Sequence, residues 1–291
     1  MNNGAGTGSG QGIYLDNYRV AAAASTQTVT LNTRTGVSVS TSLSLTNTNN
    51  VTAPFQENLG TTGFSGTTSS FTASGSATGI AGGGTGSDSL SVGVTAGTVG
   101  TAGIYSGATT LGLQTEDVNS SGLGNAGVGN QIVTINVNAY DFATAAFSQT
   151  AGDGSLTGGG VSYTLDFGTG LALNTTYTAT LQLANGMFSL YKDSLQGAYG
   201  TVGGAFSETA GNFASLTSGG TDTFTVSFFT GSTGTFTDTL TFNGTSLNTP
   251  LGNAALGQIN IGISAVAIPE PNVTALLGGL GMLLLLRRRR N

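Results

Sequence analysis

Hydrophobic and polar residues alternate along most of the chain. Val37, Val39, Thr41, Leu43 and Leu45 are separated, one by one, by serine residues. A period of two is typical of a β-strand with one buried face and one face in water. The same alternation recurs at residues 90–94, 109–113, 133–137, 163–167, 179–183, 224–228, 240–242 and 259–263.

The stretches between these segments are rich in glycine, serine, threonine and asparagine. These residues favour turns, so each stretch predicts a break between two strands. Before the last 23 residues, no segment shows the 3.6-residue period of an amphipathic helix. The pattern therefore predicts an all-β fold.

Three blocks of the first half of the chain recur in the same order in the second half. A period near 120 residues matches a small domain, whereas a β-solenoid, the alternative for so much glycine and threonine, needs a much shorter repeat. The matching pairs are residues 17–28 with 139–150, residues 83–94 with 218–229, and residues 122–137 with 250–265.

About seven short strands in each repeat predict a β-sandwich of the immunoglobulin-like type. We expect two tandem modules, at residues 19–140 and 141–267. Residues 1–18 match the last strand of a truncated preceding module, so the chain is expected to be the C-terminal part of a longer open reading frame or the product of a mis-started gene model. Residues 150–215 depart from the repeat and predict a different set of hairpins around Met187 to Tyr191.

The C-terminal tail has three parts in a fixed order. Two prolines around Glu270 block a helix upstream, and an apolar run follows over residues 273–286. As a helix this run spans about 21 Å, short of the roughly 30 Å hydrocarbon core, and the arginines that follow can snorkel and lengthen it. The tail predicts a short transmembrane helix with its basic end in the cytoplasm. The residues concerned are Pro269, Glu270 and Pro271, then Val273, Leu276, Leu280 and Leu286, then Arg287, Arg288, Arg289 and Arg290.

This order of features resembles the PEP-CTERM sorting signal, over residues 268–291 only. The resemblance implies recognition by an exosortase-type transpeptidase in the inner membrane, with processing near Pro269, Glu270 and Pro271. It also implies delivery to the outside of a Gram-negative cell that makes exopolysaccharide. On that interpretation the tail is an address and does not belong to the fold.

The body of the chain resembles the immunoglobulin-like repeat modules of large bacterial surface proteins. The resemblance lies in the alternating strand at residues 43–48, the glycine-rich turn and strand at 82–94, the turn at 121–124 and the strand at 132–140. It implies architecture and no particular chemistry.

The amino-acid composition excludes several kinds of catalytic and binding site. The chain has no histidine and no cysteine, which excludes a histidine-based triad, a thiol nucleophile, a Cys/His zinc site and a disulfide. Only three of the seven basic residues precede the tail, so there is no basic footprint for nucleic acid. Glycine, threonine and serine make up 43% of the residues, and the alternation assigns them to turns and to the wet faces of strands.

Two glycine-rich motifs have a structural interpretation. Residues 83–91 fit the nonapeptide of calcium-binding β-rolls, but that site forms between stacked copies and the neighbouring nonapeptides do not match. Residues 122–127 fit GxGxxG, but a strand is predicted after them where a dinucleotide site needs a helix. Both are expected to be turns.

The carboxylates are scattered. Glu116 and Asp117 are the only adjacent pair and could hold calcium or serve a glycosidase, but no further ligands are predicted beside them, so we expect a solvated loop. Asp88 and Asp222 share a repeat position and are expected to cap turns.

Together these patterns predict a non-enzymatic, exported cell-surface or extracellular-matrix protein with a structural or adhesive role. No cofactor, metal or nucleic-acid partner is expected. The precursor would lie in the inner membrane through its C-terminal helix, and the processed protein at the cell surface, with exopolysaccharide as a candidate partner. The alternatives are a polysaccharide-binding module and the stalk of a larger surface enzyme whose catalytic domain lies upstream.

Overall fold

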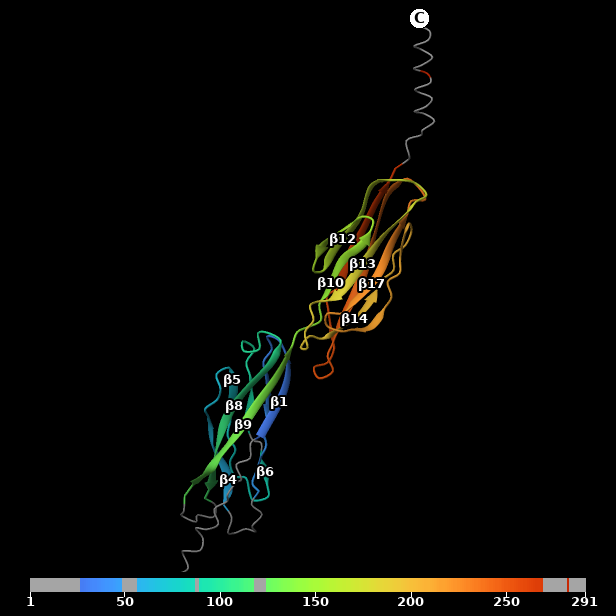
Figure 1. Ribbon diagram of the computed structural model, residues 1–291. Coiled ribbons are helices and arrows are strands. Elements are labelled where there is room, and N and C mark those ends of the chain that lie inside the picture. Colours follow the sequence, from blue (N-terminus) through green and yellow to red (C-terminus); the bar gives the residue numbers. More distant parts are fainter. Residues whose placement is uncertain (1–26, 49–56, 87–88, 118–123, 269–281, 283–291) are drawn as a thin grey trace, which may run out of the picture. The chain divides into compact units, whose positions relative to one another are not determined.

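A computed structural model describes residues 27–48, 57–86, 89–117, 124–268 and 282. Within the described residues up to 268, every element of regular structure is a β-strand (Figure 1), so the all-β prediction is confirmed. The chain divides into two compact units, Met1–Asp141 (unit 1) and Phe142–Asn291 (unit 2).

Unit 1 contains a larger sheet, a smaller sheet and a short strand pair. The strands of the larger sheet, in spatial order, are β1 (Gln27–Arg34), β9 (Ala126–Tyr140), β8 (Gly103–Glu116) and β4 (Asn58–Ser65). The smaller sheet is β2 (Val39–Ser42), β7 (Ser91–Val94) and β5 (Phe71–Ser74), and the pair is β3 (Leu45–Thr46) with β6 (Thr85–Gly86).

The core of unit 1 lies between these two sheets. Leu111 and Ile135 from the larger sheet and Val92 from the smaller one belong to the same cluster of buried residues. Over residues 109–115 of β8 and 133–139 of β9 every second residue is buried, as the alternation of hydrophobic and polar residues predicts.

Unit 2 is a two-layer sandwich of longer strands. One sheet is β10 (Ala145–Gly152), β13 (Thr176–Asn185), β17 (Thr221–Phe229) and β15 (Phe206–Glu208). The other is β11 (Ser155–Gly159), β12 (Ser162–Leu171), β20 (Ile259–Ala267), β18 (Gly234–Leu247), β14 (Ser194–Tyr199) and β16 (Phe213–Leu216), with β19 (Ala254–Ala255) beside β18.

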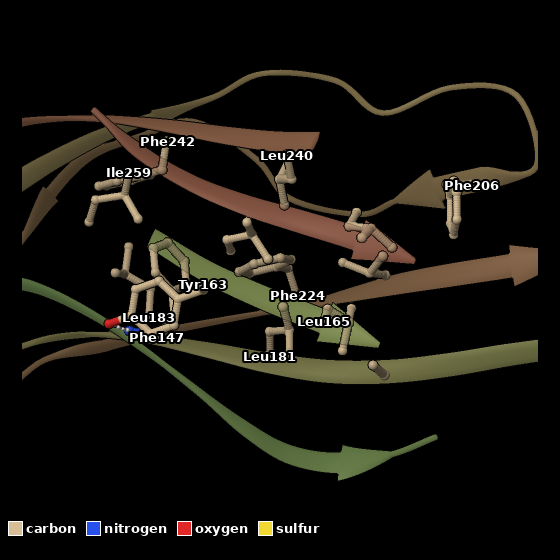
Figure 2. Packing of buried hydrophobic residues seen from close by; sticks show 14 of the residues in the cluster. Phe147, Tyr163, Leu165, Leu181, Leu183, Phe206, Phe224, Leu240, Phe242 and Ile259 are labelled. Carbon is tan, nitrogen blue, oxygen red and sulfur yellow. Dashed lines mark hydrogen bonds between the residues drawn. The ribbon is translucent and has the colours of Figure 1, made fainter. Parts of the chain in front are cut away.

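Aromatic rings fill much of the space between the sheets of unit 2. Phe147 packs edge-on against Tyr163, Phe224 and Phe242, with ring centroids 5.6, 6.2 and 5.6 Å away. Figure 2 shows these rings and the aliphatic side chains of both sheets pointing toward one another. The Tyr163 hydroxyl accepts a hydrogen bond from the backbone N–H of Phe147, which satisfies its polar end inside the core (Figure 2).

One predicted strand is wrong in its extent. The alternation over residues 37–46 predicts a single strand, but the structure breaks it into β2 and β3, which pair with different partners. Val37 lies in the turn before β2 and is exposed, whereas Leu43 and Leu45 are buried. Because serine and threonine suit turns as well as strands, the pattern carries no signal for the break.

The segment predicted to carry hairpins around Met187 to Tyr191 is the connection from β13 to β14. Unit 2 does contain a hairpin with no described counterpart in unit 1. It lies earlier in the chain, where β11 pairs antiparallel with β12. The side chains of Met187, Phe188 and Leu190 are exposed on the connection, while the Ser189 N–H donates to the Ser218 hydroxyl at 2.8 Å.

Candidate functional site: carboxylates and the outward faces of the sheets

The residues of the predicted sorting tail lie outside the described residues. These are Pro269, Glu270, Pro271, Val273, Leu276, Leu280, Leu286, Arg287, Arg288, Arg289 and Arg290. Residues 1–18, predicted to belong to a preceding module, also lie outside them. A search of the described part of the chain finds no helix that is long and apolar enough to cross a bilayer.

A buried carboxylate network occupies one end of unit 2. Asp193 is 2% exposed and accepts hydrogen bonds from the Ser246 hydroxyl and the Asn248 amide, both at 2.6 Å. Ser246 in turn accepts the backbone N–H of Ala143 at 2.9 Å. The network links Ala143, at the beginning of the unit, to β18. Asp193 therefore has a structural role, although the sequence pattern does not single it out.

Other carboxylates of unit 2 also bind the fold's own N–H and hydroxyl groups. Asp153 accepts the backbone N–H of Thr178 and Asp238 that of Gly203, both at 2.8 Å. Asp166 accepts from the Gly168 N–H and the Ser264 hydroxyl, at 2.9 and 3.0 Å. Among the described residues no three acidic side chains gather where they could share a metal ion.

Two predictions about acidic residues are wrong. Glu116 does not lie in a solvated loop: it ends β8, and its carboxylate accepts the backbone N–H of Gly79. Asp222 does not cap a turn: it lies within β17 and accepts a hydrogen bond from the Tyr199 hydroxyl at 3.4 Å. Asp88, its partner in the repeat, lies outside the described residues.

The Tyr199 hydroxyl is held in an unfavourable place for ionisation. Its ring contacts Phe224 and Phe242, each with a centroid distance of 5.0 Å. Burial, followed by the charge of Asp222 and the hydrogen bond to it, raises the pKa of Tyr199 well above its ordinary value. The hydroxyl is therefore a stable hydrogen-bond donor at physiological pH.

The glycine-rich motifs lie in the fold as turns and strand ends. Thr85 and Gly86 of the nonapeptide form β6, and Ser91 begins β7. Ala126 of the GxGxxG match begins β9, so a strand follows this motif, as predicted.

The outward faces of the sheets carry hydroxyl and amide groups. On β18 the residues that alternate with the buried ones are Thr239, Thr241, Asn243 and Thr245. On β13 and β17 the hydroxyls of Thr178 and Ser227 meet across the sheet at 3.1 Å. In unit 1 the Asn138 amide on β9 donates to Asn32 on β1 at 3.0 Å.

The larger sheet of unit 2 is hollowed on this outward face. A hollow of about 530 Å³ lies over β14, β16 and the end of β18. The side chains that line it include Gln196, Asn243 and Thr245, together with Asn212, which precedes β16. We refer to it below as the β14 hollow.

No protein-family model matches the sequence, and no curated protein matches it. Among solved structures, a PapD-like domain of human CEP192 is similar, with 12% identity and a TM-score of 0.32, over 45% of this chain and 89% of that one. The D00-D0 domain of intimin is similar over 80% of this chain and 96% of that one, with 12% identity and a TM-score of 0.27. CfaE, the adhesive subunit of the CFA/I fimbria of enterotoxigenic Escherichia coli, is similar over 64% of each chain, with 12% identity and a TM-score of 0.29.

Proposed function

We propose that this chain is a non-enzymatic surface protein with a structural or adhesive role. The observation that carries the proposal is how its polar groups are used. Carboxylates such as Asp153, Asp166, Asp193 and Asp238 accept hydrogen bonds from the fold itself, and the outward strand positions present mainly neutral hydroxyl and amide groups. Such an exterior suits a protein that remains in water and makes many weak polar contacts.

Export is the second part of the proposal. The tail with Pro269, Glu270, Pro271 and Arg287–Arg290 resembles the PEP-CTERM signal. We propose that an exosortase-type transpeptidase recognises the membrane-bound precursor and that the processed protein is released to the cell surface. The acidic body, with 12 acidic and 3 basic residues before Pro269, suits a soluble exterior there.

The test follows the full-length protein in the cell that produces it. Replacing Pro269, Glu270 and Pro271 together by alanine, or deleting Arg287–Arg290, should leave the protein in the inner-membrane fraction, protected from protease added to intact cells. Replacing Pro250, a proline of the body, is the matched control and should leave sorting unchanged. Tail variants that reach the surface as the unaltered protein does would refute the sorting step.

A further inference from the structure

The β14 hollow is built on three paired strands. The register sets Gly197 of β14 opposite Gly244 of β18, and Gly197 also pairs with Phe213 of β16. Both glycines are buried on the inward face of the sheet. The residues that flank this row therefore point outward, and the backbone pairing fixes where they stand.

The outward side chains form two short rows around the glycine pair. Gln196 of β14 lies opposite Thr245 of β18, and Ala198 lies opposite Asn243. Asn212 precedes β16 and lines the same hollow. The hollow thus offers three amides and one hydroxyl around Ala198, and Phe213 and Ala214 of β16 complete its lining.

Three of these four groups are free to bind a ligand. Within the described part of the chain, the side chains of Gln196, Asn243 and Thr245 make no hydrogen bond. The side-chain oxygen of Asn212, Oδ1, accepts the backbone N–H of Tyr199 at 3.0 Å, which orients the Asn212 side chain. The amides of Gln196 and Asn243 each supply two N–H donors and one carbonyl acceptor.

The lining residues decide the class of ligand. None of the described residues that line the hollow is charged. A phosphate or sulfate polymer would need lysine or arginine, and a calcium ion would need carboxylates. A ligand with many hydroxyl groups and no charge presents donors and acceptors together, as these amides do.

The surface beside the hollow suits a polymer better than a small molecule. Thr241 and Thr239 continue along the outward face of β18 from Asn243. A volume of about 530 Å³ falls within the range of ligand sites, while the neighbouring hydroxyls extend the same chemistry along the strand.

We propose that the β14 hollow is a binding site for a neutral polysaccharide, with Gln196, Asn243 and Thr245 as its contact residues. This assignment rests on the proposed function, because it names what the surface protein holds. Binding at the hollow requires no enzyme and no metal.

The test uses the purified full-length chain and affinity gel electrophoresis with dextran, laminarin, galactomannan and the extracellular polysaccharide of the producing cell. Alginate serves as the anionic counterpart. We expect retardation by at least one neutral polymer and none by alginate. Gln196→Ala and Asn243→Ala should each weaken binding about 5- to 10-fold, the usual effect of one lost hydrogen bond.

Asn260→Ala is the matched control because it removes the same side chain from the neighbouring strand of the same sheet, outside the hollow. It should change binding less than twofold. Ala198→Arg should fill the hollow and abolish binding even where a single amide proves dispensable. Thermal melts show that each variant is folded.

Three results would overturn the assignment: no retardation by any neutral polymer, equal retardation by alginate, or equal weakening by Asn260→Ala and Asn243→Ala. Surface exposure is measured separately, by protease treatment of intact cells. A protein that is exposed but does not bind refutes the polysaccharide site alone. A protein that binds in the gel but never reaches the surface refutes the proposed function alone.

Discussion

In unit 1 the strand β9 lies between β1, which is parallel to it, and β8, which is antiparallel. In unit 2 the strand β20 lies in the same way between β12 and β18. The smaller sheet of unit 1 and its counterpart in unit 2 also correspond, because β7 and β17 are each the neighbour of two antiparallel strands. The two units therefore share their strand connections.

Their interiors differ. Seven of the buried core residues of unit 2 are aromatic, whereas none of those described in unit 1 is. An aromatic side chain buries roughly 150–250 Å². The strands that flank the core also differ, since β13 and β17 have 10 and 9 residues and β2 and β7 have 4 each. One set of strand connections therefore accommodates two very different cores. The smaller core and shorter strands of unit 1 predict that unit 1 unfolds first.

The largest expected effect separates the two units in a calorimetric scan. Phe228→Ala removes a fully buried ring and should lower the free energy of unfolding of unit 2 by about 3–5 kcal/mol. The transition at the higher temperature should move and the lower one should not. Phe229→Ala, next along the same strand but 50% exposed, is the control and should shift neither by much. A single transition that moves as a whole would show that the two units unfold together and contradict the predicted difference in their stability.

The second-largest expected effect concerns the buried polar groups, whose removal should cost unit 2 more stability than unit 1. Asp193→Ala leaves the Ser246 hydroxyl and the Asn248 amide buried without their acceptor and should cost unit 2 about 3 kcal/mol. In unit 1 the buried Asn47 amide donates to the Ile80 carbonyl at 3.0 Å, and Asn47→Ala should cost about 1–2 kcal/mol. Urea titrations followed by circular dichroism measure both. Equal losses would show that charge adds nothing to the unit 2 network.

Each unit has a glycine beneath an aromatic ring, and these should respond alike. A Cβ at Gly107 would meet the Phe71 ring, and a Cβ at Gly197 would meet the rings of Phe213 and Phe242. Gly107→Ala and Gly197→Ala should each destabilise their own unit by about 1–3 kcal/mol. Phe71→Leu and Phe213→Leu should recover part of the loss in the double variants. If the losses of the single variants simply add in the double variants, the strain does not arise from the contact between the new Cβ and the ring.

The smallest effect concerns alkaline pH and unit 2 alone. Because the folded state raises the pKa of Tyr199, the unfolded chain releases this proton first, and unit 2 should lose stability as pH rises above about 10. Tyr199→Phe should cost about 0.5–1 kcal/mol at neutral pH and make the transition of unit 2 less sensitive to pH between 9 and 11. An unchanged alkaline slope would assign the loss to another group.

The alternation of residues predicted much of this fold. The segments around Leu111, Ile135, Leu181 and Phe224 are strands with the expected residues buried. The sequence match of residues 122–137 with 250–265 aligns β9 with β20, and each of these strands pairs in parallel with one strand of its own unit. Period-two burial is a local property, so the sequence alone carries it.

Local alternation does not predict which strands pair over long distances in the chain. Gln27 and Thr28 match Gln149 and Thr150 in sequence, yet β1 pairs in parallel with the last strand of unit 1 and β10 pairs antiparallel with β13. The β14 hollow depends on a register between residues about fifty positions apart, which no local pattern encodes. Asp193 was missed for the same reason, because its partners are Ser246 and Asn248.

The parallel pair of β1 and β9 has a mechanical consequence. Tension applied at residue 27 and at residue 140 pulls the two neighbours past each other along their length. The hydrogen bonds between Gln27–Arg34 and Val133–Tyr140 then share the load and must fail together, whereas an antiparallel pair pulled from one end opens one bond at a time. The same parallel geometry recurs between β12 and β20. The chain enters unit 2 through β10, so only in unit 1 does the parallel pair join the first described strand to the last.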